Sequence, residues 1–129
     1  MFQAINPEDV VKPISNYSNG LAAPAGRMLF VSGQVGATAD LNIPQDVEGQ
    51  ARVAFDNVQK IVEAAGGSMK DIVSVTLYLC DISDSPLVSR IRSEYFSDSP
   101  FPTSTTIGNC TFVLPQLRFE VSAIAVLSD

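Results

Sequence analysis

Residues 46–80, DVEGQARVAFDNVQKIVEAAGGSMKDIVSVTLYLC, contain one change of hydrophobic period that determines the architecture of the whole chain. Over 46–65 apolar residues recur every three or four positions, which predicts a helix with one apolar stripe. Asp46 is the expected N-cap, and Gly66 with Gly67 the expected stop. Over 72–80 apolar residues alternate, which predicts a strand, and its second face is not truly polar.

The rest of the chain supplies a second helix and three more strands. The helix is expected at about 85–96, with Pro86 in its first turn. Strands are expected at 27–32, about 104–113 and 118–127. The overall order is expected to be β-β-α-β-α-β-β, which includes one further strand before the first helix that has no assigned range. Two helices cover only one face of such a sheet, so a second copy of the chain is expected to cover the other. The sequence therefore predicts a homo-oligomer with ligand sites between its subunits.

Composition limits the class of protein. At 129 residues and 46% apolar content, residues 1–129 are expected to form one domain. The longest apolar runs have five residues and no basic segment precedes one, which predicts a cytoplasmic protein outside the membrane. Cys80 and Cys110 are expected to be buried free thiols. The formal net charge is −6 and the basic residues are scattered, so no nucleic-acid partner is expected.

The chain contains no histidine, and this excludes several chemistries. Ser-His-Asp and Cys-His nucleophilic machinery is excluded, as are zinc and iron sites with histidine ligands. Two cysteines cannot form a four-ligand zinc site unaided. We expect no metal and no cofactor, and any acid or base must be a carboxylate, Tyr, Lys, Cys, backbone group or water.

Four stretches together resemble the Rid family (reactive intermediate deaminase, YjgF, or L-PSP endoribonuclease-like). They are ISNYSNG at 14–20, LFVSGQVG at 29–36, QARVAFDNVQKIVEAAG at 50–66 with IVSVTLYLCDISD at 72–84, and FEVSAIAV at 119–126. The resemblance implies a chorismate-mutase-like α+β fold, a mixed sheet with two helices on one face. It also implies a homotrimer with small-molecule clefts between subunits, in which members hydrolyse 2-imino or 2-enamino acids to 2-keto acids and ammonia.

The same resemblance implies the site residues. Tyr17 matches the family's cleft tyrosine, Ser32 and Gly33 match its ligand-binding Ser-Gly, and Glu120 matches the glutamate that places the attacking water. The family's Pro-Ala-Arg-Ser motif, whose arginine binds the substrate carboxylate, is Pro-Thr-Ser-Thr here, with Ser104 in the arginine's place. We therefore expect an altered substrate choice and poor activity on free 2-imino acids.

Other interpretations remain open at each position. Alternation sends Ser104 and Thr106 to one face, either as ordinary strand residues or as the hydroxyl-lined floor of a substrate pocket. Glu120 is either catalytic or a surface carboxylate paired with Arg118, and Arg118 is a weak candidate for the missing cation. The leading function is hydrolysis of an imine, an enamine or a related C–N bond. The alternatives are a non-catalytic metabolite-binding or chaperone-like trimer and, least favoured by the acidic charge, a ribonuclease or translation inhibitor.

Overall fold

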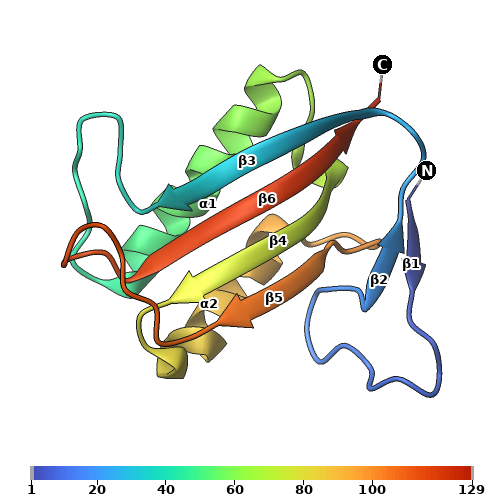
Figure 1. Cartoon of the computed structure of the whole chain (residues 1–129), viewed down its shortest axis with the longest axis horizontal. Helices are drawn as coiled ribbons and strands as arrows, with labels where there is room; N and C mark the ends of the chain where they lie inside the picture. The colour runs from blue at the N-terminus through green and yellow to red at the C-terminus, as the bar shows by residue number, and fades with distance from the viewer. Residues whose placement is uncertain (1, 129) are drawn as a thin grey trace.

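The computed structural model describes residues 2–128, so Met1 and Asp129 of the predicted domain lie outside it. Figure 1 shows the arrangement of its elements. The strands are β1 (Gln3–Ile5), β2 (Gly20–Ala22), β3 (Arg27–Val35), β4 (Ile72–Leu79), β5 (Thr103–Ile107) and β6 (Phe119–Leu127). The α-helices are α1 (Val47–Ala64) and α2 (Ser85–Tyr95), and two short 3-10 helices are η1 (Met69–Asp71) and η2 (Ile82–Asp84).

Four of the strands form one mixed sheet in the order β3-β6-β4-β5. β6 pairs antiparallel with both β3 and β4, whereas β4 and β5 are parallel. A parallel pair needs a crossover connection, and α2 provides it between β4 and β5. β1 and β2 form a separate antiparallel pair. This is the α+β architecture that the resemblance implied.

Both helices lie on the same side of the four-stranded sheet (Figure 1). Alternate β6 residues from Phe119 to Leu127 point beneath them and are buried. Phe55 of α1 is fully buried at the centre of this layer, with its ring 5.1 Å from that of Tyr95 and 5.7 Å from that of Phe119. The core therefore occupies one face of the sheet, and the other face has no helix over it.

The ends of α1 follow the sequence signals only in part. Gly66 adopts a left-handed φ of 93°, its N–H donates to the Glu63 carbonyl, and the Gly67 N–H donates to the Val62 carbonyl. These two hydrogen bonds form the Schellman motif, which agrees with the helix stop that the two glycines predicted. Asp46 does occupy the N-cap position, but its side chain makes no capping hydrogen bond. The start of α1 is fixed instead by the buried side chain of Gln50, which bonds the Pro44 carbonyl.

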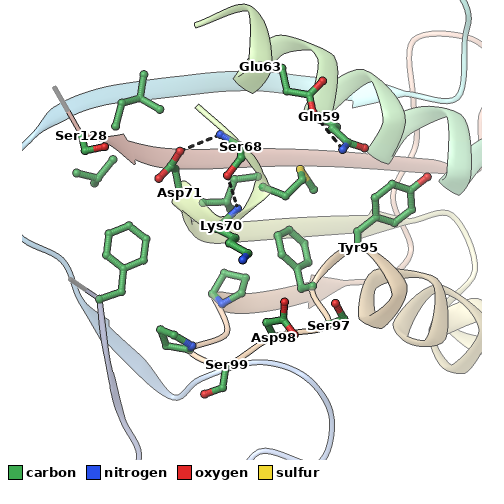
Figure 2. A pocket seen from close by; sticks show the side chains of 18 of the residues that line it. Gln59, Glu63, Ser68, Lys70, Asp71, Tyr95, Ser97, Asp98, Ser99 and Ser128 are labelled. Carbon is green, nitrogen blue, oxygen red and sulfur yellow. Dashed lines mark hydrogen bonds between the residues drawn. The ribbon is translucent and has the colours of Figure 1, made fainter. Parts of the chain in front are cut away.

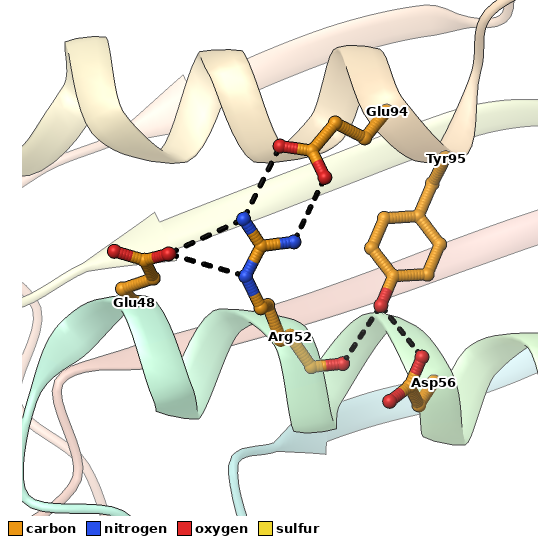
Figure 3. A network of polar contacts seen from close by, with 5 residues as sticks. All are labelled: Glu48, Arg52, Asp56, Glu94 and Tyr95. Carbon is orange, nitrogen blue, oxygen red and sulfur yellow. Dashed lines mark hydrogen bonds and ion pairs between the residues drawn. The ribbon is translucent and has the colours of Figure 1, made fainter.

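Polar side chains join the two helices on their outer side (Figure 3). Arg52 of α1 binds Glu48 on its own helix at 3.2 Å and Glu94 of α2 at 2.9 Å. Hydrogen bonding to Arg52 lowers the pKa of Glu94 below its ordinary value. The Tyr95 hydroxyl lies 2.6 Å from Asp56 Oδ1 and 3.1 Å from the Arg52 carbonyl oxygen. These contacts set how α2 lies against α1.

Three sequence predictions need correction. The strand expected at about 104–113 ends at Ile107, because Gly108 packs closely on Ile82 and Asn109 turns the backbone with a left-handed φ of 58°. Three strands, not two, precede α1, because β1 and β2 have only three residues each and are too short to show a period. Cys80 is exposed rather than buried, since it follows the end of β4, and Cys110 is only half-buried, although both cysteines are free.

Candidate functional site

A bulge in β3 holds one part of the candidate site. The pairing of β3 with β6 shifts register between Val31 and Gln34, so that Ser32 and Gly33 together oppose a single β6 residue, Ser122. A bulge of this kind re-aims side chains at the end of a strand pair. A Cβ added to Gly33 would overlap the Glu120 carboxylate, so this carboxylate lies directly against the Gly33 backbone. Gly33 thus leaves the space that Glu120 occupies.

The Glu120 side chain is half-buried on the uncovered face of the sheet. It alternates along β6 with Phe119 and Val121, which are fully buried beneath the helices. Its cross-strand partner on β4 is Tyr78. Within residues 2–128 the Glu120 carboxylate has no hydrogen-bond or ion-pair partner, so the expected alternative pairing with Arg118 is not formed. The carboxylate therefore remains available to a water or a ligand.

Ser104 and Thr106 lie on the opposite face from Glu120. Ser104 is paired with Val75 and Thr106 with Leu77, and both β4 partners are buried against the helices. Directly paired residues point to the same side of a sheet. Ser104 is half-buried on this side and Thr106 is exposed. One chain therefore does not bring the Glu120 carboxylate and the Ser104 hydroxyl together.

A cluster of polar side chains surrounds Ser104. Arg92 of α2 donates from Nη1 to Ser104 Oγ and from Nη2 to Ser89 Oγ, each at 3.1 Å. The Arg92 Cζ atom lies 5.6 Å from the centre of the Tyr17 ring. Ser15 Oγ lies 3.2 Å from Ser89 Oγ. Tyr17 and Ser104, predicted separately, thus both contact the same guanidinium.

Arg92 itself was missed by the sequence analysis. An arginine on an amphipathic helix is normally a solvated surface residue, and this expectation hid Arg92. The available signal was its position: it directly follows Ile91 and lies four residues after Val88, and both are buried. A residue with these neighbours lies at the border of the apolar stripe. Arg118, the cation weighed in its place, is exposed just before β6.

The segment that carries Tyr17 is bound to the start of β5. The Ser18 N–H donates to the Pro102 carbonyl at 3.0 Å, and Ser18 forms a parallel bridge with Thr103. A groove of about 360 Å³ opens beside this segment. Its lining includes the side chains of Lys12, Ser15 and Tyr17. The groove therefore borders the polar cluster at Ser15 and Tyr17, while Arg92 lies behind them and does not line the groove.

A larger cavity of about 610 Å³ lies where none of the predicted site residues is found (Figure 2). Glu63 from α1, Ser68 and Asp71 around η1, and Asp98 after α2 line it. Ser68 and Asp71 are engaged with each other, since the Asp71 carboxylate accepts from the Ser68 N–H at 2.8 Å. Among residues 2–128 no three acidic or cysteine side chains gather into a metal site. Neither α-helix of this part of the chain is long and apolar enough to cross a membrane.

This fold, with its Ser-Gly bulge beside a half-buried glutamate, defines a class of protein. Residues 7–127 match the family described as Endoribonuclease L-PSP, and the chain belongs to this family, which is also the Rid or YjgF family. The Rid-family protein YyfB from Yersinia pestis has a solved structure with a TM-score of 0.90, over 98% of each chain at 23% sequence identity. That likeness supports the fold alone.

Two further relatives share more sequence identity with this chain than YyfB does. The chain is 33% identical over 119 residues to a 2-iminobutanoate/2-iminopropanoate deaminase of Dermatophagoides farinae, covering 90% of this chain and 89% of the relative. It is 36% identical over 109 residues to the RutC family protein YjgH of Escherichia coli strain K12, covering 84% and 82% of the two chains. The similarity therefore extends over most of both proteins.

Proposed function

We propose that this protein is a hydrolase that converts a small imine or enamine into a carbonyl compound and ammonia. The observation that carries the proposal is the Glu120 carboxylate, which is half-buried beside Gly33 and has no hydrogen-bond or ion-pair partner among residues 2–128. The name of the mite relative, an iminobutanoate and iminopropanoate deaminase, supports the reaction type. The proposal also includes small molecules with a related C–N bond of similar reactivity as substrates.

The chemistry needs only a placed water and a proton carrier. An imine carbon is already electrophilic, so the water oxygen bonds to it while Glu120 accepts a proton from that water. The C=N bond becomes a C–N bond, and Glu120 passes this proton to the nitrogen, which gives a carbinolamine. Glu120 then accepts the proton of the carbinolamine hydroxyl and transfers it to the nitrogen as the C–N bond breaks, which releases ammonia and leaves a carbonyl group. No covalent nucleophile is required.

We further propose that the catalytic unit is a homotrimer, with each 129-residue chain as one domain. The uncovered sheet face exposes Phe30 at 68% and Met28 at 58%, which favours burial against another copy. Glu120 and Ser104 lie on opposite faces of one chain, so a cleft that holds both uses residues of two chains. Free thiols at Cys80 and Cys110 support a reducing cytoplasm as the compartment.

The test follows the lifetime of an imine. An amino-acid oxidase generates a 2-imino acid, semicarbazide traps what remains, and the semicarbazone is measured with and without the protein. Preformed neutral imines are screened in parallel by ammonia release. We expect the wild type to accelerate hydrolysis and Glu120→Gln to lose about a hundredfold in rate, the contribution typical of a placed acid–base group.

Glu8→Gln is the matched control, because Glu8 is an exposed carboxylate away from β6 and should leave the rate unchanged. Equal rates for Glu120→Gln and wild type would overturn the role of Glu120. If the wild type binds carbonyl products but accelerates the loss of no imine, the non-catalytic binding protein is the correct alternative.

A further inference from the structure

Arg92 carries a buried positive charge that no acidic side chain in the described part of the chain neutralises. Arg92 is only 4% exposed to solvent. Two of its nitrogens donate to neutral hydroxyls, those of Ser104 and Ser89. The third nitrogen, Nε, is buried and has no hydrogen-bond partner in the part of the chain that the structure describes. Within residues 2–128 no Asp or Glu forms an ion pair with Arg92.

Such an arrangement is costly unless something else completes it. Burying a charge without an ionic partner opposes folding, and a buried donor left unbonded adds to that cost. The chain has 14 acidic residues, so the missing partner does not reflect a shortage of carboxylates. Burial lowers the pKa of the Arg92 guanidinium, as expected for a cation held away from water.

The α2 helix does not supply the missing negative charge. Arg92 lies in the last turn, where carbonyl groups carry partial negative charge. Its guanidinium, however, reaches Ser89, one turn closer to the start of the helix, and so points away from that end. The face of the Tyr17 ring offers weak cation–π attraction, at 5.6 Å from Cζ. Neither contact replaces an anion.

A groove borders two residues that contact this cluster, Ser15 and Tyr17, and among residues 2–128 no acidic residue lines it. Lys12, an exposed cation, lines the groove together with Ser15 and Tyr17. Ser15 contacts Ser89, and Tyr17 lies against the guanidinium itself. The groove is large enough for a small organic acid, at about 360 Å³.

We propose that Arg92 is the anion-recognition group of this protein and that it binds the carboxylate of a small organic acid approaching past Tyr17. Ser104 stands where the family resemblance placed an arginine, and Arg92 Nη1 bonds the Ser104 hydroxyl. The helix thus supplies the guanidinium that the strand lacks. This replaces the expectation of poor activity on free 2-imino acids, which become acceptable substrates.

The test uses binding and does not depend on turnover. Butanoate and its uncharged counterpart butanamide are titrated into the full chain, and the Arg92 Nε–H signal is followed by ¹H–¹⁵N NMR. We expect butanoate, but not butanamide, to shift this signal. We expect Arg92→Met to weaken butanoate binding by about tenfold or more, the value of one charge-assisted contact. Arg90→Met, which removes an exposed arginine from the same helix, should bind as the wild type does.

Several outcomes would overturn the proposal. One is an Arg92 Nε–H signal that does not shift when butanoate is added. This measurement uses the wild type alone, so it remains valid even if Arg92→Met fails to fold. Another is equal affinity for butanoate and butanamide, or unchanged affinity in folded Arg92→Met. The proposal rests on the proposed function only in treating the acid as a substrate or product. Butanoate binding through Arg92 without any hydrolysis would contradict the proposed enzymatic function and support the Arg92 site. Hydrolysis of neutral imines without butanoate binding would support the enzymatic function and contradict the Arg92 site.

Discussion

Gln50 shows how one buried polar side chain fixes the surroundings of the sheet. It is fully buried, its Nε2 donates at 2.9 Å to the carbonyls of Pro44 and Gln116, and its Oε1 accepts from the Arg118 N–H at 2.7 Å. Gln50→Leu keeps the volume but leaves three backbone groups unbonded. We expect a loss of about 3 kcal/mol in the free energy of unfolding, measured by denaturant titration.

Gln59→Leu is the control for this substitution. Gln59 lies on the same helix, and its amide donates only to Glu63, at 3.3 Å. A change within about 0.5 kcal/mol is expected there. Losses of the same size in both variants would mean that the three bonds of Gln50 contribute nothing of their own.

Gly33 should matter for activity rather than for stability. A methyl group at this position would occupy the space of the Glu120 carboxylate, which sits at the end of a flexible side chain and moves aside at little cost. We expect Gly33→Ala to lower the rate of imine hydrolysis by about a hundredfold, as displacement of a reacting group by 1 Å can. The melting temperature should stay close to that of the wild type.

Gly20→Ala provides the comparison, because its added methyl meets only ordinary contacts with Ile5, at 3.5 Å from Cβ. It should retain both rate and stability. Full activity in Gly33→Ala would show that the position of the Glu120 carboxylate against the bulge is irrelevant to the reaction.

At the scale of elements, the Tyr95 hydroxyl is a polar link from α2 to α1, alongside the Arg52–Glu94 ion pair. Burial, and then the hydrogen bond to Asp56, raise the pKa of Tyr95 above its ordinary value. The unfolded chain loses the Tyr95 proton near pH 10, and the folded chain loses it only at higher pH. The stabilisation is therefore complete below pH 10 and declines as the pH rises beyond it.

We expect Tyr95→Phe to reduce the free energy of unfolding by about 1 to 2 kcal/mol at pH 7 and by less above pH 10. Denaturant titrations of both proteins at the two pH values measure this. Tyr78→Phe is the control, since the Tyr78 hydroxyl has no hydrogen-bond partner in residues 2–128, and its substitution should have little effect at pH 7. A Tyr95→Phe deficit that grows above pH 10 would contradict the assignment.

The sequence predicted the elements whose pattern is long and local. The α1 stripe and the alternation of β4 and β6 each span eight residues or more, so their periods are unambiguous. β1 and β2 have three residues each, and the early end of β5 depends on how closely Gly108 approaches Ile82. Period alone does not reveal such tertiary contacts.

The candidate site was predictable to a different degree. Tyr17, Gly33 and Glu120 follow from the family resemblance, and the structure adds where each lies. The proposed role of Arg92 depends on which face of the sheet carries the Ser104 side chain, because Arg92 bonds that side chain. The pairing register of β5 with β4 determines this face, and the sequence alone does not reveal the register. The separation of Ser104 from Glu120 has the same origin.

At the scale of the molecule, the uncovered sheet face should control assembly and activity together. Phe30 lies on this face opposite Ile124, and Met28 opposite Val126, so apolar side chains of two strands form a continuous surface. Burial of one phenylalanine stabilises an interface by about 2 kcal/mol, and a carboxylate there opposes it instead. We expect the wild type to sediment as a trimer and Phe30→Asp as a monomer in analytical ultracentrifugation.

The monomer should also lose hydrolysis, because Glu120 and Ser104 lie on opposite faces of one chain and the proposed cleft brings them together only between two copies. Val11→Asp tests whether any exposed apolar position has this effect, since Val11 is 80% exposed on the N-terminal segment and away from the sheet face. It should remain trimeric and active. A wild type that sediments as a monomer with full activity would place the whole reaction within one chain, which the separation of these two residues does not allow.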